Sequence, residues 1–456
     1  MIDNSFLMPT LVYWLDPDLL AIVTDGENSA KVLASSMALI GLFVFIFSRF
    51  FREITARIGL PLVIGDLIAG LVIGVSGLHI LVPEGAQINP FLVNLIELVA
   101  PTTPEEIQAV FDGPVHLIVE QYAEFGAGLV LLSIGLESNL KQLLKVGWQS
   151  ATVAVVGLTL PLVFGFLGLI YLFHLPTITA LFAGGALTAT GLGISAKVMQ
   201  ELEILKSTEG QIILGAAILD NILGLVILAI LISIVETGSI DVGNVAKLIL
   251  TAAIFILTAV MMNLFFGPWF ITQLEKLKAP ASIGMGSFIL FILWSFVAGI
   301  IGLESILGAF AAGLILGGTK AREELIKSVS VLSIIFETVF LVSIGAKTDL
   351  NLVNPTVASN REGITVALFL ITVAITSKII AGFFAFSSEK INRLGIGTGM
   401  VPRGEVVLLF AGLGATTGIL PPAINVAIVL MVIATTFLSP PLLRIIFTRD
   451  SQLTQP

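Results

Sequence analysis

The sequence has no cysteine and little charge. Asp, Glu, Lys and Arg make up only 12% of its 456 residues, while 56% are hydrophobic; a soluble domain carries roughly 25% charged residues. Without cysteine there is no disulfide, no thiolate metal site and no cysteine nucleophile. A chain of this length and composition has too little polar surface to cover itself in water. We therefore predict an integral membrane protein that crosses the bilayer many times.

Several classes of function are also excluded. The formal net charge is -9, with 22 basic and 31 acidic residues, so no nucleic-acid partner is expected. The chain has no Walker loop and no glycine-rich dinucleotide fingerprint, so we expect neither a nucleotide-driven pump nor a cofactor. His79, His116 and His174 are far apart in sequence and do not suggest a metal site. No nucleophile-base arrangement falls in the apolar segments, so we do not expect an enzyme.

Apolar runs of roughly 15–27 residues recur about thirteen times, which predicts an all-α fold of about 13 transmembrane helices. Their approximate limits are 32–51, 61–80, 114–136, 150–174, 177–200, 210–235, 243–270, 283–303, 304–318, 327–348, 363–387, 396–417 and 420–446. The apolar segment 88–100 is too short to span and is expected in the interface. Residues 1–30 have no basic n-region and no clean cleavage site, so we interpret them as an external segment rather than a signal peptide.

Basic residues follow alternate spans, which sets the expected orientation. Lys141 and Lys145 follow the third span, and other Lys or Arg residues follow the first, seventh, ninth, eleventh and last spans. Segment 77–115, in contrast, contains no Lys or Arg. Cytoplasmic loops are enriched in these residues. We therefore expect the N-terminus outside and the tail 447–456 in the cytoplasm.

The chain also repeats itself. Residues 59–74 (GLPLVIGDLIAGLVIG) and 302–317 (GLESILGAFAAGLILG) share seven identical positions, and SIGLESNL at 133–140 is echoed by SIGAKTDL at 343–350. Apolar strings of Gly, Ala and Leu also resemble each other by chance, which is the alternative interpretation. Because both matches keep their order, we predict two six-helix inverted repeats, an organisation typical of secondary transporters. The expected parts are a first repeat (31–242), a linker span (243–282) and a second repeat (283–446).

Charged residues within apolar spans are costly and suggest function. Asp220 and Asn221 lie near the middle of the sixth span. A carboxylate there can bind a cation or a proton, and a group that binds either but not both can couple two fluxes. Lys378, within the eleventh span, is the best candidate partner, because a buried ion pair lowers the cost of both charges. The alternatives are a structural carboxylate, and a lysine that extends to the interface.

Two further segments are candidates. Pro402 and Gly404 interrupt a helix where Arg403 and Glu405 enter the membrane, so these two charges either clamp the broken helix or contact an ion. The fifth span is rich in glycine and has a Thr-Ala-Thr motif at 188–190. The Thr hydroxyls either ligate a cation or cap unwound backbone, and the alternative is close helix packing through small residues.

Four other acidic residues are interpreted as funnel-lining or span-end groups rather than as the coupling site; they are Asp66, Glu124, Glu137 and Glu337.

At these motifs the sequence resembles the second monovalent cation:proton antiporter family, which includes sodium/proton exchangers and relatives of potassium-efflux antiporters. The most specific motifs are GAAILDNILGL, the Thr-Ala-Thr stretch, the Lys378 segment and VPRGEV, and the resemblance covers nearly all of 30–446. It implies a homodimer with a dimerisation domain and a mobile core domain, in which two broken helices cross. By this resemblance the core residues are Thr188, Thr190, Asp220, Asn221, Lys378, Arg403 and Glu405.

The resemblance has one departure, at position 221. Many family members have Asp-Asp where this chain has Asp220-Asn221, and the second carboxylate is usually credited with carrying ion and proton. An amide can ligate a cation through its oxygen but cannot titrate. Either Asp220 alone performs the coupling, or the chain is a substituted, transport-impaired form.

We expect a secondary active antiporter that exchanges Na+ (or Li+ or K+) for H+ by alternating access. Asp220, Asn221, Thr188 and Thr190 are the expected cation- and proton-binding residues, and Asp220 and Asn221 are the first candidates as Na+ ligands. The alternatives are a channel-like cation pathway and a potassium-efflux system. The expected partners are a monovalent cation, protons and membrane lipid. The expected location is a prokaryotic inner membrane, or a thylakoid membrane if the protein is cyanobacterial.

Overall fold

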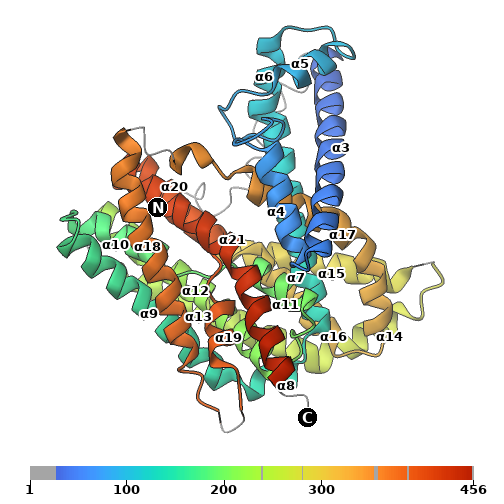
Figure 1. Cartoon of the computed structure of the whole chain (residues 1–456). Helices are drawn as coiled ribbons and strands as arrows, with labels where there is room; N and C mark the ends of the chain where they lie inside the picture. Colours follow the sequence, from blue (N-terminus) through green and yellow to red (C-terminus); the bar gives the residue numbers. More distant parts are fainter. Residues whose placement is uncertain (1–26, 238–239, 280, 354–357, 388–389, 454–456) are drawn as a thin grey trace. The chain divides into compact units, whose positions relative to one another are not determined.

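The computed structural model describes residues 27–237, 240–279, 281–353, 358–387 and 390–453 (Figure 1). Across these ranges the chain consists of helices joined by turns and loops, without a β-strand. The expected external segment 1–30 lies almost entirely outside the described residues, and so do the last three residues of the expected tail.

The prediction of an all-helical, multi-pass membrane protein is confirmed. In the described part of the chain, nine helical segments are long and apolar enough to cross a membrane. They are Asn28–Arg57, Pro104–Glu137, Gly147–Tyr171, Thr208–Val235, Val242–Leu274, Ser282–Ile300, Arg322–Leu352, Arg361–Gly382 and Pro422–Thr448.

The other expected spans contain shorter helices. These are α4 (Leu62–Ile73), α10 (Thr177–Ala186) with α11 (Leu192–Glu201), α16 (Ser305–Gly317), and α19 (Arg393–Gly399) with α20 (Glu405–Thr416). Apolar composition continues through the loops and breaks that end these helices, so composition alone does not reveal where the helices stop. The expected interfacial segment contains α5 (Pro90–Glu97), which at about 1.5 Å per residue is too short to span.

The remaining helices complete the element order. They are α3 (Glu27–Arg57), α6 (Pro104–Val110), η2 (Phe111–Val115), α7 (His116–Glu137), α8 (Leu140–Lys145), α9 (Gly147–Tyr171), α12 (Thr208–Thr237), α13 (Val242–Met261), η3 (Met262–Phe266), α14 (Gly267–Leu274), α15 (Ser282–Ile300), α17 (Arg322–Ala346), η4 (Leu350–Val353), α18 (Ala358–Gly382) and α21 (Pro422–Leu453). Side-chain caps begin several of them: Asn139 accepts from the amides of Lys141 and Gln142 at the start of α8, which satisfies amides that lack helical partners.

The chain forms two compact units. The first contains residues 1–130, 295–306 and 327–351, and the second contains 131–294, 307–326 and 352–456.

In the first unit α3 packs along α4 (Figure 1). A Cβ atom at Gly65 would lie 2.7 Å from the backbone nitrogen of Arg52, so the absence of a side chain allows this close approach. A buried polar network joins the two helices to α17. Ser48 Oγ donates to Asp66 Oδ1 (2.6 Å), and Arg52 lies 3.6 Å from Asp66 Oδ2 and 3.9 Å from Glu337 Oε1. Arg52 therefore places one positive charge near both acidic side chains, Asp66 and Glu337, within this unit.

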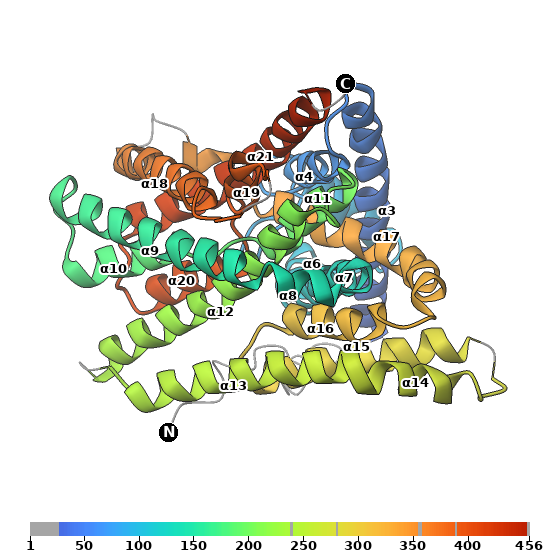
Figure 2. The same cartoon turned by 90° about the horizontal axis from the view of Figure 1, so that it is seen from below.

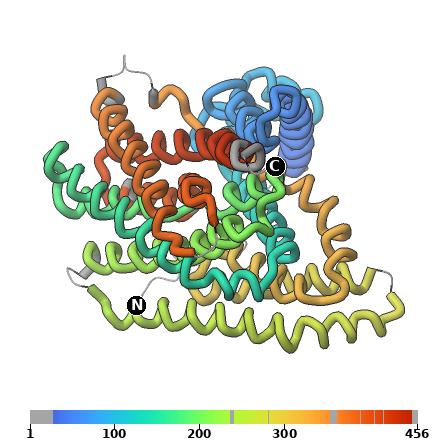
Figure 3. Tube along the Cα trace, turned by 60° about the horizontal axis from the view of Figure 1, so that its bottom comes forward, coloured from blue at the N-terminus to red at the C-terminus, as the bar shows by residue number. Residues whose placement is uncertain are grey.

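In the second unit α9 packs against α12, α10 and α18, and α18 packs against α21 (Figure 2). The apolar core between them includes Phe182 and Phe410, whose rings meet edge-on with centroids 6.5 Å apart. Segments α13, η3 and α14 form one uninterrupted helical rod (Figure 3). Within this unit the carboxylate of Glu137 accepts from Gln200 Nε2 (2.7 Å).

Candidate functional site

The site is built around two helix breaks in the second unit. One break separates α10 from α11 at 187–191, and the other separates α19 from α20 at 400–404. The breaks touch, because the amide of Gly191 donates to the carbonyl of Pro402 (2.7 Å). A Cβ atom at Gly404 would lie only 2.8 Å from Gly191 Cα, so both positions need glycine for this contact. Pro402 cannot donate a helical hydrogen bond, which is one reason why the second helix stops here.

Each break leaves backbone carbonyls without helical partners, and buried side chains satisfy them. Arg403 is fully buried, and its Nη1 donates to the carbonyls of Thr188 (3.2 Å) and Ala189 (2.8 Å). Its Nη2 lies 3.4 Å from the carbonyl of Ala374 on α18. A guanidinium also neutralises the partial negative charge at the C-terminal end of α10. The Arg403 guanidinium therefore donates to backbone carbonyls at the first break and on α18.

The hydroxyls around the breaks have similar roles. Thr188 Oγ1 donates to the carbonyl of Gly185 (2.7 Å), which lies in the last turn of α10. Ser195 Oγ donates to the carbonyl of Gly399 (2.7 Å), and Thr436 Oγ1 donates to that of Arg403 (3.2 Å). Ser195 and Thr436 were not among the residues predicted from the sequence. Their only signal is a hydroxyl residue in an apolar helix, which is common in membrane proteins.

Asp220 lies beside the breaks, in the middle of α12, and is fully buried. Its Oδ2 accepts from Lys378 Nζ of α18 (2.7 Å) and from Thr190 Oγ1 (2.6 Å). The Thr190 hydroxyl also lies 3.1 Å from the carbonyl of Met400, so its single proton is shared between two acceptors. Oδ1 of Asp220 has no hydrogen-bond partner among the described residues. The carboxylate therefore has one oxygen occupied and one available for a further ligand.

The expected ion pair between Lys378 and Asp220 is present, and both side chains are shielded from solvent. Both side chains are 0% exposed, and the Nζ–Oδ2 distance is 2.7 Å. The lysine passes close to Gly157 of α9, where a Cβ atom would make an ordinary van der Waals contact with Nζ (3.4 Å). The alternative, a Lys378 that extends to the interface, is wrong.

The structure brings most of the predicted residues together. Thr190, Asp220 and Lys378 are in direct contact, and Thr188 and Arg403 contact each other in the layer around them. Asn221 follows Asp220 on α12 and is 1% exposed. The backbone of Glu405 begins α20, but its side chain lies outside the described part of the structure.

Comparisons with known proteins show which family the chain resembles. A family model described as "Sodium/hydrogen exchanger, transmembrane" matches residues 37–449. The chain is 44% identical over 399 residues to the "High-affinity Na(+)/H(+) antiporter NhaS3" of Synechocystis, which covers 87% of this chain and 86% of that protein. It is 30% identical over 366 residues to the "Na(+)/H(+) antiporter" of Enterococcus hirae, covering 79% and 85%.

A solved structure has the same fold. The sodium proton antiporter MjNhaP1 from Methanocaldococcus jannaschii aligns with a TM-score of 0.60, over 93% of this chain and 99% of that one. The sequence identity is 15%, so this likeness concerns the fold alone.

Proposed function

The chain belongs to the sodium/hydrogen exchanger family, and on that premise we propose that Asp220 and Lys378 form the coupling centre of its ion exchange. The resemblance expected from the sequence is thereby confirmed. The protein is a Na+/H+ antiporter, which is a secondary active transporter and not an enzyme. The buried 2.7 Å contact between Lys378 Nζ and Asp220 Oδ2 is the observation that carries the proposal.

The proposal is that the ammonium group of Lys378 and a sodium ion compete for one carboxylate. In the cation-free state the ammonium neutralises Asp220. A sodium ion at Oδ1 would place a second positive charge near the ammonium. Two unit charges about 4 Å apart repel by about 4 kcal/mol at an effective dielectric constant of about 20. Lys378 therefore releases its proton when the cation binds, and the cation leaves when the proton returns.

The neighbouring residues would complete the cation site. Hard cations take oxygen ligands from carboxylates, amides, hydroxyls and carbonyls. Thr188, Thr190 and the amide oxygen of Asn221 are the proposed additional ligands, because they lie at or beside the carboxylate and its helix break. Arg403 and Glu405 are proposed to support the breaks rather than to bind the ion.

A proton-flux assay tests the proposal. Proteoliposomes with an imposed pH gradient and a trapped pH-sensitive dye should show dequenching when Na+ is added outside. Asp220→Asn should abolish this signal, because the amide neither titrates nor attracts a cation. Asp241→Asn is the matched control. Asp241 is an exposed N-cap of α13, and asparagine caps as well as aspartate, so exchange should persist.

Adding Li+ and K+ in separate runs tests the ion preference. A response to K+ that exceeds the response to Na+ would favour the potassium-efflux alternative. Cation flux that continues without any pH change would favour the channel-like alternative. Normal exchange by Asp220→Asn, with folding verified, would refute the proposed centre.

We also propose the finer architecture of two six-helix inverted repeats, with about thirteen membrane-crossing elements in total and two crossed, broken helices. When the repeated sequences are aligned, Gly70 corresponds to Gly313, and Gly135 corresponds to Gly345. In the first unit a Cβ atom at Gly345 would lie 3.0 Å from Gly70 Cα. In the second unit a Cβ atom at Gly313 would lie 2.9 Å from Gly135 Cα. Gly70 of the first repeat thus packs against Gly345 of the second, and Gly135 of the first repeat packs against Gly313 of the second. The same glycine contact therefore occurs twice, with the two repeats in exchanged roles, which supports a common origin of the two halves.

The remaining proposals concern assembly and placement. The family resemblance supports a homodimer with a mobile core that alternates access to Asp220. The distribution of Lys and Arg supports an external N-terminus and a cytoplasmic C-terminus. A prokaryotic inner membrane or a thylakoid membrane is the proposed location.

A further inference from the structure

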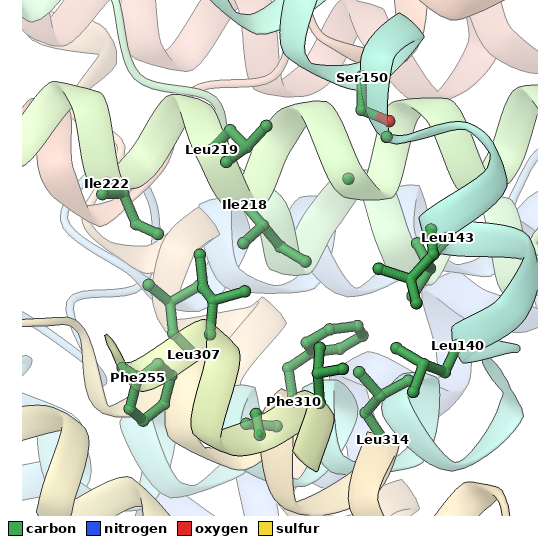
Figure 4. A pocket seen from close by; sticks show the side chains of 17 residues that line it. Leu140, Leu143, Ser150, Ile218, Leu219, Ile222, Phe255, Leu307, Phe310 and Leu314 are labelled. Atoms are coloured by element: carbon green, nitrogen blue, oxygen red, sulfur yellow. The ribbon is translucent and has the colours of Figure 1, made fainter. Parts of the chain in front are cut away.

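The second unit contains an apolar cavity, and none of the proposed ion-binding residues lines it. Its volume is about 180 Å³, and residues of α9, α12, α13 and α16, together with Leu140, Leu143 and Leu144 of α8, line it (Figure 4). Every lining side chain except that of Ser150 is apolar, and Ser150 Oγ donates to the carbonyl of Ile212 (3.3 Å). A cavity without free polar groups does not hold ordered water.

The size and position of the cavity fit a lipid acyl chain. Apolar cavities of about 150 Å³ can bind a benzene-sized guest, so this volume accommodates a comparable length of alkyl chain. Ile256 of α13 lines the cavity and is also 37% exposed, so the cavity is open beside the outer face of α13. Leu250, Ile254 and Leu257 are exposed on that same span and would contact lipid in a membrane.

Two positive charges lie on α8, the short helix that contributes three leucines to the cavity lining. Lys141 and Lys145 of α8 are exposed and stand four residues apart, so they share one helix face. The three leucines of α8 that line the cavity occupy the adjacent face. Trp148, which is 73% exposed, follows at the start of α9, and exposed tryptophan is typical of the membrane interface.

We propose that this cavity binds one acyl chain of an anionic phospholipid, whose phosphate group pairs with Lys141 and Lys145. The chain gains dispersion contacts that an unfilled void lacks, and the lysines attract the negative headgroup. Ile218, Leu219 and Ile222 of α12 form one wall, so the bound chain packs against the helix that carries Asp220. The bound lipid therefore stabilises α12 in its place. The effect of the lipid on exchange, unlike its binding, rests on the proposed function.

Photolabelling tests the binding. The purified protein in nanodiscs receives phosphatidylglycerol with a diazirine at the end of one acyl chain, and labelled peptides are identified by mass spectrometry. We expect labels on 140–150, 215–222 and 255–260, and at least fivefold fewer with the phosphatidylcholine analogue. Inorganic phosphate should not compete, because it lacks the chain. Equal labelling by both lipids, or no label on these peptides, would overturn the proposal.

A cavity-filling variant with a matched control tests the location of the site. Ala259→Phe fills the cavity and should reduce labelling at least fivefold, whereas Ala253→Phe adds the same ring to an exposed position of α13 and should not. Unchanged labelling in Ala259→Phe would overturn the assignment.

A charge variant serves if Ala259→Phe fails to fold. Replacing both Lys141 and Lys145 with Gln should lower phosphatidylglycerol labelling to the phosphatidylcholine level. Replacing the exposed Lys276 and Lys278 with Gln removes the same charge elsewhere and should have no effect. Equal labelling of the two charge variants would refute the role of α8.

A transport assay distinguishes failure of the lipid-site proposal from failure of the proposed function. Exchange in phosphatidylcholine liposomes should change at least twofold when phosphatidylglycerol is added, and Ala259→Phe should abolish that dependence. Pocket labelling without exchange in any lipid would count against the proposed coupling centre and would support the lipid site alone. Exchange with the same lipid dependence in Ala259→Phe would overturn the inference and leave the coupling centre standing.

Discussion

The buried pair of Lys378 and Asp220 makes a quantitative prediction about stability. Both side chains are 0% exposed, so neither charge can turn to water when its partner is removed. Breaking one member of a buried ion pair costs about 3–5 kcal/mol, because the remaining charge is stranded. We therefore expect Lys378→Met, which keeps most of the side-chain volume, to lower the free energy of unfolding by about that amount. Asp220→Asn should have a similar effect.

The double variant should be more stable than the sum of the two single effects predicts. With both charges gone, no stranded ion remains, and we expect a coupling energy of about 2–3 kcal/mol. Unfolding of the detergent-solubilised protein, followed by circular dichroism against denaturant, measures all four states of the cycle. Met at 378 also removes a donor to Asp220, but Thr190 still donates to the carboxylate, so the cycle isolates mainly the charge pair.

An exposed pair in the same unit is the control. Lys320 Nζ lies 2.8 Å from Glu275 Oε2, nearly the same separation, but the side chains are 69% and 36% exposed. Exposed pairs contribute only about 0.2–1 kcal/mol, so a cycle of Lys320→Met and Glu275→Gln should show little coupling. If the buried pair were additive within about 0.5 kcal/mol, the reasoning from burial would be refuted.

Three further predictions concern the breaks, position 221 and the topology. Gly191→Ala should cost about 1–3 kcal/mol and reduce exchange, because its Cβ atom would lie 2.9 Å from the backbone of Arg403. Gly412→Ala, where a Cβ atom meets nothing within 4 Å, should do neither. Asn221→Asp should increase Na+- or Li+-dependent proton movement in the dequenching assay at several pH values, because two adjacent carboxylates cannot both stay charged cheaply. Equal exchange by both forms would mean that the amide is sufficient. Single cysteines replacing Glu84 and Ser451 should react with an impermeant reagent outside only at the first site, and equal labelling would contradict the proposed orientation.

The contact between Asp220 and Lys378 could be predicted from the sequence because each of these charged residues is unusual in an apolar span. A carboxylate in the middle of 210–235 and a lysine within 363–387 are both costly in an apolar span, and each needs a partner. Asp220 and Lys378 were therefore the best candidate partners for each other, because a buried ion pair lowers the cost of both charges. The structure contains that pair as a direct contact.

The partners of Arg403 could not be predicted in the same way. Its guanidinium donates to backbone carbonyls of Thr188, Ala189 and Ala374, and every residue type carries such a carbonyl. The position of the first break was hidden for a related reason. The segment 177–200 is apolar and glycine-rich throughout, and these properties suit a continuous packed helix as well as a broken one.

Position 221 links the structure to the number of protons exchanged. With an amide there, the proposed centre has one carboxylate and one ammonium, and binding of one cation would displace one proton from Lys378. The total charge of the proposed centre would then be the same in both states, so its passage across the membrane would move no net charge. A second carboxylate at position 221 would hold a proton of its own in the cation-free state. Entry of one cation would then displace two protons, and the cycle would become electrogenic. By this argument the lysine provides the first exchangeable proton, and the identity of residue 221 decides whether there is a second.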